Sequence, residues 1–159
     1  MLLNKKIESK MIKLQHEIIK NLFTDKHNYK LYQDMDNVYI IYNQCCTYII
    51  PKQYFYLDLC KICINDVGRL QDLCNTNNIE SQAYMTNKNI VHDKQTLQQF
   101  TNNDNSIQCY FNYKYLKDID VYSQSYKYYF KDFKDNLKML LLCVDNKPFI
   151  LLAPTKVTI

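Results

Sequence analysis

The same order of segments occurs near both ends of this 159-residue chain. Residues 7–23 predict a helix, and strand-like segments follow at residues 29–33, 37–43 and 46–51. Residues 106–111 predict a strand and residues 112–122 a short helix, and three more strands follow as YKYYFKDF, KMLLLCVD and KPFILLAP. We therefore predict an internal repeat of two βαβββ units, in which the first strand of the first unit is lost or very short at residues 1–4.

Apolar periodicity supports both kinds of element. The first helix carries one apolar stripe, formed by Ile7, Met11, Leu14, Ile18 and Leu22. The strand-like segments are rich in Tyr, Ile and Val and are bounded by Asp, Asn or Pro. Because a helix with one apolar stripe must cover a sheet face, we predict an α+β fold with two helices side by side on one face of antiparallel sheet.

The middle of the chain carries a weaker pattern. Pro51 predicts the start of a helix, and residues 66–74 predict a second short one. Residues 75–106 are rich in Asn, Gln and Thr, which predicts a long connection with one or two short strands or helices. The expected organisation is one domain, with a first half-unit at residues 1–51, an irregular connection at 52–105 and a second half-unit at 106–159.

The net charge of +4 is confined to one end of the chain. Residues 1–30 contain seven lysines and three acidic residues, and the remainder contains 13 basic and 13 acidic residues. Lys6, Lys10, Lys13 and Lys20 recur at helical spacing beside the apolar stripe. This asymmetry favours a nucleic-acid or membrane-facing helix, and the alternative is an ordinary solvated face. With Arg69 as the one arginine, phosphate contacts would depend on lysine.

Catalytic and metal chemistry find little support in the sequence. One glycine excludes a glycine-rich phosphate loop, and no histidine lies beside a distinctive nucleophile. Cys60 and Cys63, with Cys74 and His92, would supply a zinc site, but their helical setting favours buried thiols. We expect no metal, no cofactor, no disulfide and no enzyme activity. Seven cysteines and no apolar run of membrane-spanning length predict a reduced, cytoplasmic protein with no membrane partner.

Two phrases resemble a known family. FNYKYLKDI, from Phe111 to Ile119, and KPFILLAP resemble the closing half of a domain of the bacterial DNA sliding clamp, the beta clamp. MIKLQHEIIKNLF followed by NVYIIYNQCCTYIIP is similar to short clamp-like proteins of phages and mobile elements. This chain departs from the family at Asn43, Gln44 and Cys46, where Asp-Gly and a nearby Arg are usual. The resemblance covers most of residues 7–60 and 106–156.

The resemblance implies a non-catalytic processivity factor that tethers a polymerase or another replication protein to DNA. Contacts to duplex phosphates would fall at Lys6, Lys10, Lys13, Lys114 and Lys117, and a single domain would have to self-assemble to encircle DNA. A second function is a small viral interaction protein or inhibitor that keeps a clamp-like fold and binds a host or viral protein. The neutral charge of residues 31–159 favours this alternative.

Tyr126, Tyr128 and Tyr129 would provide a stacking platform for single-stranded nucleic acid if they are not packing residues.

Overall fold

The computed structural model describes residues 5–21, 29–57, 68–117, 126–134 and 137–157. The chain forms two compact units, residues 1–69 and 70–159. Each unit contains helical segments and antiparallel strands, so the fold is of the α+β class.

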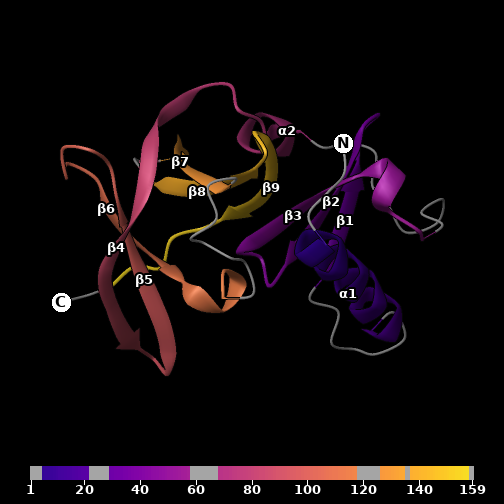
Figure 1. The fold of residues 1–159 in the computed structure, drawn as a ribbon, viewed down its shortest axis with the longest axis horizontal. Coiled ribbons are helices and arrows are strands. Elements are labelled where there is room, and N and C mark those ends of the chain that lie inside the picture. Colours follow the sequence, from indigo (N-terminus) through magenta and orange to yellow (C-terminus); the bar gives the residue numbers. More distant parts are fainter. Residues whose placement is uncertain (1–4, 22–28, 58–67, 118–125, 135–136, 158–159) are drawn as a thin grey trace. The chain divides into compact units, whose positions relative to one another are not determined.

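The first unit contains a helix and a three-stranded meander (Figure 1). Helix α1 spans Lys5–Asn21, and β1 (Tyr29–Gln33), β2 (Asn37–Tyr42) and β3 (Cys46–Pro51) follow in antiparallel order. These elements confirm the helix and the three strands predicted for this part of the sequence. The predicted strand at residues 1–4 lies outside the described residues.

The apolar stripe of α1 is the buried side of the helix. Ile7, Met11, Leu14 and Ile18 are all at most 5 % exposed. A hydrogen bond of 2.9 Å from the hydroxyl of Tyr29 in β1 to the Glu17 carboxylate also links the helix to the sheet. Gln15 binds the segment that follows β3, since its amide donates to the carbonyl of Tyr54 and its oxygen accepts from the amide of Tyr56.

The second unit is a six-stranded antiparallel sheet. Its strands follow the order β9-β8-β7-β4-β5-β6, and the short helix α2 (Arg69–Leu73) precedes them. The strands are β4 (Ile79–His92), β5 (Gln95–Thr101), β6 (Gln108–Asn112), β7 (Tyr126–Asp132), β8 (Lys138–Val144) and β9 (Lys147–Leu152). The predicted strands of the second half-unit are confirmed as β6 to β9, and α2 lies within the predicted short helix.

Strand β4 takes part in two parts of this sheet. Its first residues pair with β7, ending at Ala83 opposite Tyr128, and from Tyr84 onward it pairs with β5. The two parts therefore diverge near Tyr84. The chain after β9 returns to β6, where the amide of Thr155 donates a 2.8 Å hydrogen bond to the carbonyl of Tyr110.

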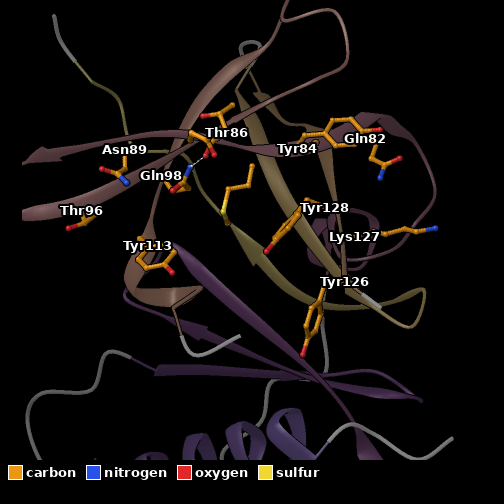
Figure 2. A pocket seen from close by; sticks show the side chains of 13 residues that line it. Gln82, Tyr84, Thr86, Asn89, Thr96, Gln98, Tyr113, Tyr126, Lys127 and Tyr128 are labelled. Carbon is orange, nitrogen blue, oxygen red and sulfur yellow. Dashed lines mark hydrogen bonds between the residues drawn. The ribbon is translucent and has the colours of Figure 1, made fainter. Parts of the chain in front are cut away.

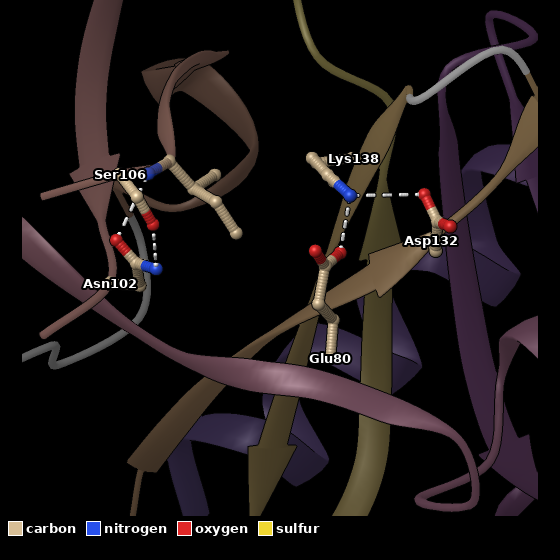
Figure 3. A network of polar contacts seen from close by, with 6 residues as sticks. Glu80, Asn102, Ser106, Asp132 and Lys138 are labelled. Carbon is tan, nitrogen blue, oxygen red and sulfur yellow. Dashed lines mark hydrogen bonds and ion pairs between the residues drawn. The ribbon is translucent and has the colours of Figure 1, made fainter. Parts of the chain in front are cut away.

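The prediction for residues 75–106 is wrong in extent. Instead of a mainly irregular connection, these residues form the 14-residue β4 and the seven-residue β5. Polar side chains form many of the hydrogen bonds in this region, so the composition of residues 75–106 is typical of a loop. In the turn before β6, Asn102 donates to Ser106 and accepts from the amide of Ile107 (Figure 3).

Two predicted helices are also corrected. The helix expected from Pro51 is a single 3₁₀ turn, η1 (Lys52–Tyr54), after which Phe55 is extended. The helix expected from Asn112 is, within the described residues, the 3₁₀ turn η2 (Tyr113–Tyr115). The side chain of Asn112 accepts from the amide of Lys114, so the predicted cap is confirmed although the helix is short. Residues 58–67 and 118–125 lie outside the described part.

In the second unit, ion pairs of Lys138 link β8 to β7 and, across β7, to β4. The ammonium of Lys138 in β8 lies 2.6 Å from the carboxylate of Glu80 in β4 and 3.1 Å from that of Asp132 in β7 (Figure 3). These contacts raise the pKa of Lys138, chiefly through the hydrogen bond to Glu80. They hold three strands in register close to where β4 begins.

Candidate functional site

The lysines of α1 fall into two groups. Lys13 and Lys20 are exposed and lie seven residues apart, close to the same line along the helix. Lys10 is half-buried, and its ammonium lies 5.8 Å from the ring centroid of Tyr48. The side chain of Lys6 lies outside the described part. Of the predicted phosphate contacts on α1, Lys13 is therefore presented to solvent, whereas Lys10 is engaged with the sheet.

Two further predicted contacts lie at η2. Lys114 and Lys117 are both exposed. The ammonium of Lys114 lies 4.9 Å from the ring centroid of Tyr115, a cation–π distance that leaves the charge at the surface. The two units are described separately, so a common surface formed by the lysines of α1 and η2 stays a prediction.

A cavity of about 660 Å³ lies in the second unit where β4 changes partner (Figure 2). Side chains from β4, β5, η2 and β7 line it. Its volume is in the range of small-molecule sites, which bury most of a ligand in about 300–1,000 Å³. This site was not predicted, although Tyr126 and Tyr128, which line it, belong to the tyrosine platform considered from the sequence.

A bulge in β4 shapes one wall of the cavity. Met85 pairs with Phe100 and Asn89 with Gln98, so three residues of β4 face one residue of β5. The amide of Gln98 donates to the carbonyl of Thr86 at 2.6 Å and to that of Lys88 at 3.2 Å. A buried glutamine thus replaces ladder hydrogen bonds that the bulge removes, and bulges of this kind commonly turn side chains toward a site.

Tyrosine hydroxyls gather on the opposite wall. Tyr128 is 6 % exposed, and its hydroxyl has no hydrogen-bond partner among the described residues. Its ring packs edge-to-face on Phe100 at 4.9 Å between centroids. Burial raises the pKa of Tyr128, and the nearby Tyr113 and Tyr126 raise it further. The Tyr128 hydroxyl is therefore a protonated hydrogen-bond donor at neutral pH.

The charge of the cavity wall is low. The described residues that line it include one cation, Lys127, and no carboxylate. Figure 2 shows the Lys127 side chain pointing away from Tyr113 and Tyr128. The wall consists mainly of amides, hydroxyls and aromatic rings, a composition suited to an uncharged ligand that forms several hydrogen bonds.

The described cysteines and histidines form no cluster. Within the described ranges, no three His, Cys, Asp or Glu side chains lie close enough to hold a metal ion, and no disulfide joins one described cysteine to another. Cys60 and Cys63 lie outside these ranges. Burial raises the pKa of the Cys143 thiol to about 11 and also raises that of Cys109, which disfavours the reactive thiolate form.

Comparisons with known proteins give no match: no family model, no curated protein and no solved structure is similar to this chain. None of the helices in the described part of the chain has the length and hydropathy needed to cross a membrane.

Proposed function

We propose that this chain is a non-catalytic, sliding-clamp-like accessory protein of a phage or mobile element, which holds replication proteins at duplex DNA. The observation that carries the proposal is the recurrence of one element order. A helical element precedes three antiparallel strands as α1 with β1–β3 and as η2 with β7–β9. Exposed lysines lie at both helical elements, Lys13 and Lys20 at the first and Lys114 and Lys117 at the second.

Lysine contacts to phosphate would give affinity without sequence preference. Each lysine that neutralises a phosphate releases counterions, so the logarithm of affinity falls with the logarithm of salt by about 0.9 per contact. Spacing along α1 suits this role, because residues seven apart on a helix are separated by about 10 Å. Charge and exposure therefore support a footprint centred on Lys13 and Lys20 rather than on Lys10.

The direct test measures binding of fluorescently labelled duplex by anisotropy across a salt series. We expect Lys13→Glu combined with Lys20→Glu to weaken binding at least about tenfold at low salt, because two attractive charges become repulsive. Lys30→Glu combined with Lys147→Glu is the matched control, since both lysines are exposed but lie on strands. If both variants lose the same affinity for duplex DNA, the effect reflects net charge alone. If the α1 variant binds as tightly as the parent, Lys13 and Lys20 do not contact phosphate.

A clamp built from single domains must also assemble. Light scattering would then give a multiple of the 19.2 kDa chain mass. A monomer at all concentrations, together with no duplex binding at low salt, would favour the second candidate, a small interaction protein that binds a host or viral protein. The contact between Lys10 and Tyr48 favours that candidate, because it withdraws one predicted phosphate contact.

A further inference from the structure

The cavity where β4 leaves β7 is lined by a buried tyrosine hydroxyl that forms no hydrogen bond with the described residues. Tyr128 is 6 % exposed and its hydroxyl has no partner among the described side chains and backbone groups. Figure 2 shows this side chain directed toward the space beside Tyr113 and Tyr126. A buried hydroxyl without a partner is unfavourable, so a ligand that accepts its hydrogen bond would relieve the penalty.

The remaining wall determines which ligand fits. No carboxylate lies among the described lining residues, and the ammonium of Lys127 points away, which disfavours a ligand whose charge is buried. Asn87 and Asn89, at the β4 bulge, provide amides, each with a donor and an acceptor in one plane. Planar amides match the paired donor and acceptor groups on the edge of a nucleobase.

Aromatic surface completes the match. The ring of Tyr113 lines the cavity and is half-buried, so it retains accessible surface. Such a ring stacks on the face of a planar base. A sugar offers hydroxyls to the amides but no flat face to the ring, so the wall favours a base.

We propose that the cavity bounded by the β4 bulge, β7 and η2 binds an uncharged nucleobase, presented by a nucleoside, with Tyr128 as a hydrogen-bond donor to it. The site stands apart from the phosphate-binding proposal, because none of the lysines invoked there lines the cavity. Failure of duplex binding would leave this inference intact, and failure of nucleoside binding would leave the phosphate-binding proposal intact.

The test is calorimetric titration of the full chain with adenosine, thymidine, 2-deoxyribose and glucose. We expect at least one nucleoside to bind in the millimolar range or tighter, and neither sugar to bind. Tyr128→Phe keeps the ring that packs on Phe100 and removes the hydroxyl, so it should weaken nucleoside binding by about five- to tenfold. Tyr129→Phe is the matched control, because Tyr129 is the next residue of β7 and does not line the cavity.

Three outcomes would overturn the inference: neither nucleoside binds, the sugars bind as well as the nucleosides, or Tyr128→Phe and Tyr129→Phe bind alike. Far-ultraviolet circular dichroism and a cooperative thermal transition establish that each variant is folded. If Tyr128→Phe does not fold, Tyr113→Ala removes the stacking ring at a half-buried position and should weaken nucleoside binding at least about fivefold. Unchanged nucleoside binding by this variant would likewise overturn the inference.

Discussion

The most buried charge in the described residues belongs to Lys131, which is 2 % exposed. Its ammonium donates to the carbonyls of Asp72 at 2.9 Å and Asn75 at 2.8 Å, and also to the carbonyl of Asn77. These acceptors lie in the last turn of α2 and in the loop that leads to β4. Burial lowers the pKa of Lys131, and the three carbonyls compensate the charge with hydrogen bonds.

Replacing Lys131 tests whether this residue holds the loop. Lys131→Met keeps the apolar stem and leaves three carbonyls without their donor, so we expect a loss of about 3 kcal/mol in the free energy of unfolding. Lys127→Met on the same strand is the control, and because Lys127 is exposed it should change stability by less than about 0.5 kcal/mol. Urea denaturation measures both. Equal effects would show that Lys131 contributes no more than a surface lysine.

The turn between β1 and β2 depends on a second charged residue, Asp34. Its carboxylate accepts hydrogen bonds from the Tyr39 hydroxyl at 2.6 Å and from the amides of Asn37 at 2.8 Å and Asp36 at 2.9 Å. Burial acts to raise the pKa of Asp34, but these hydrogen bonds outweigh it and lower the pKa below its ordinary value. The ionised form is therefore favoured by folding.

A lowered carboxyl pKa gives stability that is present above the unfolded pKa of about 4 and is lost as pH falls through the folded value. We expect Asp34→Asn to be less stable than the parent at pH 7, by about 1.5–3 kcal/mol for hydrogen bonds to a charged acceptor. The difference should shrink near pH 3. Thermal unfolding at both pH values measures it, with Asp36→Asn, an exposed carboxylate of the same turn, as the control. A difference that is independent of pH would contradict this account.

Among the elements, two hairpins, β4–β5 and β8–β9, use the same two-residue turn without glycine. Their second positions are Lys94 and Asn146, with φ of 63° and 64°. The first positions are Asp93 and Asp145, also with positive φ. Turns with two positive φ values match strand twist and normally place glycine second, since other residues are strained there. Strand pairing on both sides compensates this strain.

Glycine at such a position should stabilise the chain. We expect Lys94→Gly, in the β4–β5 turn, to raise the free energy of unfolding by about 0.5–1 kcal/mol. Gln95→Gly is the matched control: it lies one residue later, where β5 begins, and should lower stability by about 0.5–1 kcal/mol. Chemical denaturation compares the two. If both substitutions destabilise, the turn residue is not strained.

How well an element could be predicted depended on how its interior is filled. Strands β1–β3 and β6–β9 bury aliphatic and aromatic residues, so their composition indicated strands. Strand β5 buries Gln98 and Gln99. The Gln98 amide donates to the carbonyl of Thr86 in β4 and the Gln99 oxygen accepts from the Thr86 hydroxyl, and local composition does not show those partners. Within the described residues, the helix expected after Asn112 is the 3₁₀ turn η2, where Tyr115 and the following Leu116 are buried in the core.

The candidate sites, too, could be predicted only where they depend on local sequence. Charge asymmetry pointed to Lys13 and the family resemblance to Lys114 and Lys117, and all three are exposed. It could not show that Lys10 lies over Tyr48, because that contact joins residues 38 positions apart. The cavity was missed since it requires the bulge in β4, and the polar stretch that forms the bulge resembles a connecting loop.

For the whole molecule, the boundary at residue 70 differs from the half-unit predicted to begin at residue 106. The difference concerns β4 and β5, which supply Leu97 and Phe100, both fully buried. Phe100 packs edge-to-face on Phe111 at 5.6 Å and on Tyr128 at 4.9 Å. Strands β6 and β7 are therefore joined through a residue of β5, and the sheet order places β4 and β5 between them.

Two fragments distinguish these boundaries. We expect residues 70–159 to fold alone, because this fragment keeps all six strands, the Phe100 contacts and the carbonyls that surround Lys131. Residues 106–159 should remain unfolded, because they lack the strands that separate β6 from β7, and about 50 residues bury too little apolar surface without them. Circular dichroism and the cooperativity of thermal unfolding measure both, with the full chain as reference. A cooperative transition in the shorter fragment would establish the sequence-predicted half-unit as the folding unit, and an unfolded longer fragment would show that residues 1–69 are required for the second unit to fold.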